Sequence, residues 1–156
     1  MHRLLALLLI LFPASAGAQG PESYKTILFV CEHGAAKSVV AAAHFNKLAS
    51  ERGLHVRAIS RGTSPDAKVP DPIREGLRGE GLPLDAGFKP TLVRAPDVDG
   101  AARVIVFDVA LPEGAQSTRL TRWDGLPAFS DGYASASGAI AAKVSMLVAE
   151  MAGSRR

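Results

Sequence analysis

The stretch Lys25-Thr-Ile-Leu-Phe-Val-Cys31-Glu-His-Gly-Ala-Ala-Lys37-Ser38 decides the fold of this chain. Residues 27–30 form an apolar, partly β-branched run, which predicts a strand that is covered on both faces. A short loop that contains the small residues 34–36 follows Cys31, and a helical pattern extends from about Lys37 to Arg52. The stretch therefore predicts a strand, a short loop and a helix, with the only cysteine of the chain where the strand ends.

A single cysteine at this position has two explanations. Free cysteines are commonly buried bystanders in a core. Cys31 would instead lie beneath a helix N-terminus, where loop N–H groups and the helix dipole favour a thiolate and a bound oxyanion. Since α/β folds bind ligands at the carboxyl ends of their strands, the position favours a functional thiol.

The first 18 residues are predicted to be a signal peptide. Arg3 supplies the positive region, an apolar run extends from Leu4 to Phe12, and the small residues 16–18 form a cleavage site. The run is too short to span a membrane, although an uncleaved N-terminal anchor is the alternative. We expect a single domain over residues 19–156, periplasmic or secreted, with no membrane partner after cleavage.

The charge and composition exclude some classes of partner. The chain carries 18 Lys and Arg against 15 Asp and Glu, a formal net charge of +3. This excess is scattered, forms no Lys/Arg run and has almost no interleaved aromatic residues, so nucleic-acid binding is not expected. The single cysteine allows no intramolecular disulfide. No metal site and no cofactor are expected.

The rest of the chain alternates strands and helices. Strands are predicted at about 55–60, 102–108 and 119–123, and helices at about 73–79, 97–100 and 134–152. This order predicts an α/β fold, a small four-stranded parallel, doubly wound sheet with helices on both faces. Cys31, Asp108 and the region of Asp124 fall at the carboxyl ends of these strands, where a site is expected.

These segments resemble the low-molecular-weight protein tyrosine phosphatases and the arsenate reductases that share their fold. Those proteins place Arg and Ser six and seven residues after the cysteine, where this chain has Lys37 and Ser38. Ala58-Ile-Ser-Arg-Gly-Thr63 and Trp123-Asp124 with Pro127 are similar to later segments of the family. The resemblance covers nearly the whole chain after the predicted signal peptide, and it implies a low-molecular-weight phosphatase-like fold.

The resemblance implies a nucleophilic mechanism in which the thiolate attacks phosphorus and an Asp protonates the leaving group. Cys31 would form a cysteinyl-phosphate, with Lys37 and Asp124 as the other catalytic residues. The phosphate-binding loop would comprise Glu32, His33, Gly34, Ala35, Ala36, Lys37 and Ser38. The implied partner is a phosphorylated small molecule or a phosphoprotein of the phosphotyrosine type, or another oxyanion.

Three departures from the family pattern bear on activity. Lys37 cannot hold two phosphoryl oxygens with a planar fork, as an Arg would. The loop interior is changed, and His33 could pair with the thiolate or be an exposed loop residue. The family's acid directly precedes a Pro, where this chain has Leu126. Asp124 is the first candidate for the acid and Asp131 the second, and either could be a turn or capping residue.

These residues are compatible with three functions. The leading hypothesis is an exported phosphatase that hydrolyses a phosphate monoester through Cys31. The alternative is a catalytically inactive member that binds an oxyanion or a protein partner, which Lys37 and Leu126 favour. A thiol-dependent arsenate reductase ranks last, because the thioredoxin-coupled reductases relay electrons through additional cysteines that this chain lacks.

Overall fold

The computed structural model describes residues 24–115 and 117–154, so the predicted signal peptide lies outside the described residues. The strands are β1 (Lys25–Cys31), β2 (Val56–Gly62), β3 (Ala101–Val106) and β4 (Leu120–Arg122). The helices are α1 (Lys37–Glu51), α2 (Asp71–Gly79), α3 (Ala95–Asp99) and α4 (Tyr133–Gly153), and a short 3₁₀ turn, η1 (Phe129–Asp131), precedes α4.

The four strands form one parallel sheet in the order β2-β1-β3-β4, as the sequence predicted. β1 lies between β2 and β3, and a hydrophobic core packs against each face of the sheet, so residues 27–30 are fully buried. Side chains alternate between the two faces along a strand. Phe29 therefore enters one core and Val30 the other.

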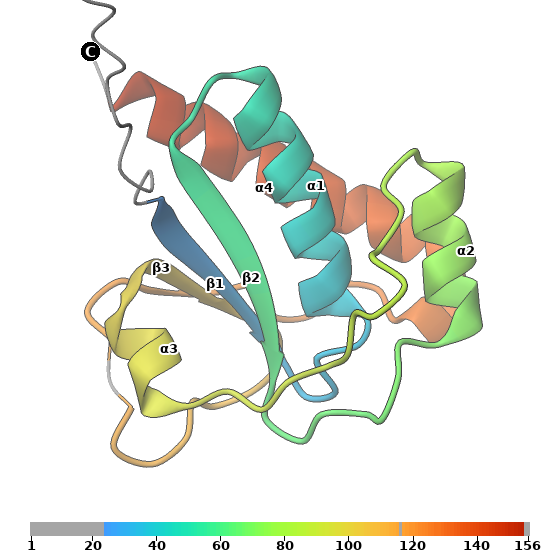
Figure 1. Cartoon of the computed structure of the whole chain (residues 1–156), viewed down its shortest axis with the longest axis horizontal. Helices are drawn as coiled ribbons and strands as arrows, with labels where there is room; N and C mark the ends of the chain where they lie inside the picture. The colour runs from blue at the N-terminus through green and yellow to red at the C-terminus, as the bar shows by residue number, and fades with distance from the viewer. Residues whose placement is uncertain (1–23, 116, 155–156) are drawn as a thin grey trace, which may run out of the picture.

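Helices cover both faces of the sheet, also as predicted. α1, α2 and α4 contribute to the larger core, in which Phe29 contacts the rings of Phe45, Phe107 and Trp123. The smaller core on the opposite face includes Val98 of α3. Figure 1 shows α1 and α4 on one side of the sheet and α3 on the other. This arrangement leaves the carboxyl ends of the strands as the common edge at which a site can form.

Element boundaries differ from the sequence expectations at two instructive places. β2 extends to Gly62, two residues beyond the expected end, because Gly62 pairs with Cys31 of β1 and bridges to Leu92. β3 ends at Val106 instead of Asp108, and Asp108 has a positive φ of 54°, far from the extended values of a regular strand. Both differences lie beside the predicted site.

A polar cluster joins the helices of the larger face. The Glu80 carboxylate, just after α2, accepts hydrogen bonds from Ser137 Oγ at 2.8 Å and Tyr133 Oη at 3.1 Å. His44 Nε2 of α1 lies 3.1 Å from the same carboxylate. Burial raises the pKa of Tyr133 to about 12. The cluster fixes the start of α4, where Tyr133 contacts the Phe129 ring of the preceding turn.

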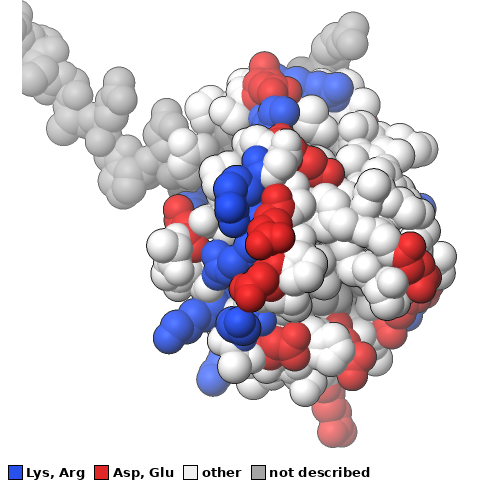
Figure 2. Space-filling view, turned by 90° about the vertical axis from the view of Figure 1, so that its right-hand side faces the viewer, with Lys and Arg blue, Asp and Glu red and all other residues white. Residues whose placement is uncertain are grey.

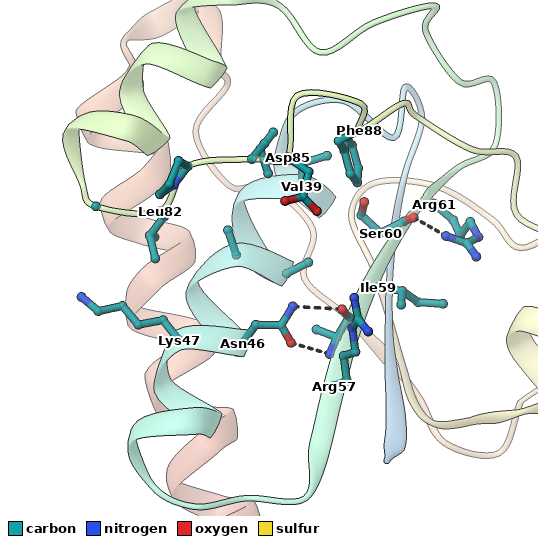
Figure 3. Close-up of a pocket in the computed structure, with 16 residues that line it drawn as sticks. Val39, Asn46, Lys47, Arg57, Ile59, Ser60, Arg61, Leu82, Asp85 and Phe88 are labelled. Atoms are coloured by element: carbon teal, nitrogen blue, oxygen red, sulfur yellow. Dashed lines mark hydrogen bonds between the residues drawn. The ribbon is translucent and has the colours of Figure 1, made fainter. Parts of the chain in front are cut away.

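The outer edge of β2 is closed by a side chain of α1. Asn46 Nδ2 donates to Ala58 O at 3.1 Å, and Ala58 N donates to Asn46 Oδ1 at 2.7 Å (Figure 3). The side-chain amide thus takes the place of a neighbouring strand and protects part of the edge from pairing with another chain. A groove of about 490 Å³ lies here between α1, β2 and residues 81–88, and Cys31 is not among its lining residues.

Within the described residues, no helix is both long and apolar enough to cross a membrane. On the face drawn in Figure 2, Lys and Arg side chains lie directly beside Asp and Glu side chains. Neither sign of charge forms a separate patch on this face.

Candidate active site

Cys31 is the last residue of β1, and its buried thiol faces the first turn of α1. Its Sγ lies 3.1 Å from the Oγ of Ser38, a residue that is itself fully buried. A hydroxyl at this distance can donate a hydrogen bond to a thiolate, and the N-terminus of a helix favours the same negative charge. The structure thus brings together the cysteine and the serine that the sequence predicted.

The loop between β1 and α1 turns its carbonyl groups towards residues 63–66. The carbonyl oxygens of Cys31, Glu32 and His33 accept hydrogen bonds from the N–H groups of Thr63, Ser64 and Asp66. Gly34 has a φ of +60°, which changes the direction of the chain within the loop. No backbone hydrogen bond among the described residues has an N–H group of residues 32–36 as its donor, so these groups could bind an anion.

Two glycines allow the loop to approach β2 closely. A Cβ added at Gly34 would lie 2.8 Å from Gly62 N, and one added at Gly62 would lie 2.7 Å from Gly34 N. Neither position has space for a side chain, because the atoms opposite are backbone. Gly62 was expected only as part of a loop, and its contact with the predicted phosphate-binding loop was not apparent from the sequence.

Lys37, the residue at the family's Arg position, is held by two groups of the protein. Its Nζ lies 2.7 Å from Asp108 Oδ2 and donates to Leu126 O at 3.1 Å. Asp108 follows β3, which pairs with β1 in the sheet, so the two residues meet across the carboxyl edge. The Lys37 ammonium and the Gly125 N–H group keep the pKa of Asp108 below its usual value.

Asp124, the first candidate for the acid, is engaged elsewhere. Its carboxylate pairs with Arg122 at 2.7 Å and accepts a hydrogen bond from Asp108 N at 2.9 Å. The Arg122 hydrogen bond lowers the pKa of Asp124. Asp131 lies in η1 and accepts a hydrogen bond from Ser130 Oγ. Asp124 therefore supports the Asp108 backbone in this structure.

A cavity of about 200 Å³ opens at Cys31. Polar and charged residues of the loop and of the β3 end line it together with an apolar wall: Cys31, Glu32, His33, Lys37 and Asp108, with Phe107, Val109 and Phe129. Asp124 and Asp131 are not among the described residues that line this cavity. Of the predicted catalytic residues, Cys31 and Lys37 line the same cavity. Asp124 does not line it and instead accepts a hydrogen bond from the backbone of Asp108.

His33 lies at the exposed rim of the cavity. Its Nδ1 is 3.2 Å from Asp66 Oδ1, and its Nε2 is 3.6 Å from Glu32 Oε2. More than half of each of the His33 and Glu32 side chains is exposed to solvent. Both ring nitrogens thus face carboxylates, and the ring connects the loop to residues 63–66.

Asp108 was not assigned a role from the sequence, although the signal was present. It directly follows an apolar strand that was expected to lie in the same parallel sheet as the strand that ends at Cys31. Residues at neighbouring carboxyl ends of a parallel sheet converge.

Among the residues described, no group of three His, Cys, Asp or Glu side chains has the geometry to hold a metal ion.

A strand, a short loop and a helix with a thiol at the strand end are an arrangement that cysteine-dependent phosphatases and the arsenate reductases of the same fold share. A model of the family "Low molecular weight phosphotyrosine protein phosphatase" matches residues 26–110. The chain belongs to this family, whose members bind phosphorylated substrates. A comparison with curated protein sequences found no match.

Solved structures of related proteins have the same fold. YfkJ from Bacillus subtilis is 22% identical, with a TM-score of 0.74 over 88% of this chain and 100% of that chain. The low-molecular-weight protein tyrosine phosphatase from T. tengcongensis is 19% identical, with a TM-score of 0.64 over 81% and 97%. An arsenate reductase from Archaeoglobus fulgidus is 25% identical, with a TM-score of 0.59 over 81% and 98%.

Proposed function

We propose that the protein hydrolyses phosphate monoesters through Cys31. The observation that carries the proposal is the Cys31 thiol beside Ser38 at the N-terminus of α1, in a loop with available N–H groups. Cys31 Sγ attacks phosphorus, the ester P–O bond breaks, and the leaving oxygen keeps the electron pair. Water then attacks the cysteinyl-phosphate, releases inorganic phosphate and returns the thiolate.

The surroundings of the cavity favour aryl esters as substrates. Leu126 stands where the family has its acid, and the lowered pKa values of Asp108 and Asp124 leave both carboxyls ionised at neutral pH. An ionised carboxylate cannot protonate a leaving group. Phenolates leave as anions more readily than alkoxides do, and the apolar Phe107 and Phe129 suit an aromatic ring. The substrate class is therefore a phosphotyrosine-like ester on a small molecule or a protein.

A Cys31→Ser variant and two Lys37 variants test the proposal with p-nitrophenyl phosphate. We expect turnover by the wild type and none by Cys31→Ser, because the alcohol is a much weaker nucleophile than a thiolate. Lys37→Arg is expected to raise kcat/KM, because a guanidinium binds two phosphoryl oxygens, whereas Lys37→Gln is expected to lower it. Turnover that survives Cys31→Ser would contradict the mechanism.

A binding-only role is the second candidate, and the Lys37–Asp108 ion pair favours it. In that case the protein would bind inorganic phosphate or vanadate, and Cys31-dependent turnover would be absent. Calorimetric titration with phosphate, run beside the turnover assay on the same preparations, separates the two functions. An arsenate reductase would in addition consume an external thiol in the presence of arsenate.

Export through a cleaved signal peptide remains a proposal based on residues 1–18, which lie outside the described residues. It predicts that the mature protein begins at Gln19 and is periplasmic or secreted. Mass spectrometry of the protein recovered from a periplasmic extract and from the medium tests both points. A full-length chain confined to the cytoplasm would contradict them.

A further inference from the structure

Asp108 is held in an unusual backbone conformation by the turn at 124–125. Within the described residues it is the one non-glycine residue with a positive φ, 54°. Such a conformation persists where the surroundings fix it, and it is concentrated at functional sites. Here Asp108 N donates to Asp124 Oδ1 at 2.9 Å, and Gly125 N donates to Asp108 Oδ1 at 2.8 Å. These reciprocal bonds fix both the backbone and one oxygen of Asp108.

The other carboxylate oxygen of Asp108, Oδ2, forms an ion pair with the Lys37 ammonium. The Nζ–Oδ2 distance is 2.7 Å, and Leu126 O accepts a second hydrogen bond from the same Nζ at 3.1 Å. An ammonium group has three donors, so two of them are already used within the protein. The Lys37 side chain is only 20% exposed, which limits its freedom to turn to another partner.

We propose that Asp108 is a built-in competitor for the oxyanion at this site. Its carboxylate takes one N–H donor of the Lys37 ammonium and compensates the positive charge that Lys37 would offer to a phosphoryl group, so an incoming oxyanion competes with Asp108 for Lys37. Glu32, at the rim of the same cavity, adds a second negative charge. The inference rests on the proposed function only in placing the oxyanion at the Cys31 loop.

The opposite role makes the opposite prediction. If Asp108 served to aim Lys37 at the oxyanion, removing its charge would weaken oxyanion binding. If it competes, removing its charge strengthens oxyanion binding. The sign of the change in affinity therefore decides between the two roles, whether or not the protein turns over an ester.

The test is the Asp108→Asn variant, titrated calorimetrically with inorganic phosphate and with vanadate. Asn tolerates a positive φ, and its amide oxygen can still accept from Gly125 N, so the fold is expected to persist. We expect both affinities to rise about three- to tenfold, the range for a partly exposed charge pair. Asp99→Asn, an exposed residue of α3, is the charge-matched control and is expected to leave the affinities unchanged.

A double variant shows whether Asp108 acts through Lys37. In a Lys37→Gln background, Asp108→Asn is expected to lose most of its effect, because the freed cation is no longer present. Phosphate and vanadate binding that is unchanged or weaker in Asp108→Asn overturns the inference, even where Cys31-dependent turnover confirms the phosphatase. Tighter binding without any turnover supports the inference while the hydrolytic function fails.

Discussion

Cys31 Sγ and Ser38 Oγ lie 3.1 Å apart, both buried, across the junction of β1 and α1. Among the described residues, Ser38 is the one side chain within hydrogen-bond distance of the thiol, so removing its hydroxyl should destabilise the thiolate directly. Hydrogen bonds to charged groups contribute about 1.5–3 kcal/mol.

We therefore expect Ser38→Ala to lower kcat/KM for p-nitrophenyl phosphate by about tenfold or more, and to slow alkylation of Cys31 by iodoacetamide. Both rates are measured at one fixed neutral pH. Ser50→Ala, at an exposed position of the same helix, is the matched control. Equal alkylation rates in Ser38→Ala and wild type would show that Ser38 does not stabilise the thiolate.

Gly62 should tolerate no side chain. A Cβ there would lie 2.7 Å from Gly34 N in the predicted phosphate-binding loop, and backbone cannot move aside as a flexible side chain can. We expect Gly62→Ala to destabilise the protein by about 2 kcal/mol or more and to abolish phosphate binding. Thermal unfolding and calorimetry measure the two effects. Gly87→Ala, whose Cβ would meet nothing within 4 Å, should change neither.

Leu126 gives a prediction about the leaving group. Because Leu126, and not a carboxylic acid, directly precedes Pro127, the rate should depend steeply on the acidity of the phenol that leaves. Leu126→Asp is expected to raise the rate with phenyl phosphate more than the rate with p-nitrophenyl phosphate. The ratio of the two kcat/KM values is the measurement.

Leu126→Asn controls for the loss of an apolar side chain that packs against the larger core. It should leave the ratio of the two kcat/KM values at its wild-type value. A ratio that Leu126→Asp also leaves unchanged would mean that position 126 cannot deliver a proton to the leaving oxygen.

The backbone of the site was predictable from the sequence, and the partners of its side chains were only partly so. The apolar run before Cys31 and the helical pattern from Lys37 are local signals, and both elements begin where the sequence placed them. Asp108 and Lys37 are 71 residues apart, and their contact depends on the register of two parallel strands and on the 124–125 turn. No local pattern encodes such a contact.

Contacts between distant parts of the chain also explain why Asp124 supports the backbone of Asp108 and does not line the cavity, and why Asp108 is the residue that pairs with Lys37. Asp124 is close in sequence to Pro127, which made it the natural candidate for the acid. Its place in space is set by Arg122 and by the positive φ of Asp108, and neither can be read from the spacing of residues. Gly62 is similar, because a close approach of two backbones becomes visible only once the strands are paired.

Asn46 should contribute to stability at the edge of the sheet. It makes two hydrogen bonds to Ala58, one as donor and one as acceptor, at a partly buried position. We expect Asn46→Ala to lower the free energy of unfolding by about 1–2 kcal/mol, and urea denaturation measures this change. Lys47→Ala, at the next and exposed position, should stay within about 0.5 kcal/mol of wild type. A neutral Asn46→Ala would show that water replaces the side-chain amide at no cost.

Acidic pH should lower the free energy of unfolding, because it protonates the carboxylates of Asp108 and Asp124. The folded-state pKa of each carboxyl lies below its ordinary value of 3.8, because Lys37 stabilises the Asp108 carboxylate and Arg122 that of Asp124. Each contribution is therefore complete above that ordinary value and is lost as the pH falls through the lowered pKa. We expect the free energy of unfolding, measured by urea denaturation, to decrease from about pH 4 downwards, and to decrease less steeply in Asp108→Asn. Asp99→Asn should keep the wild-type slope, and an equally steep slope in Asp108→Asn would show that its ion pair with Lys37 does not stabilise the fold.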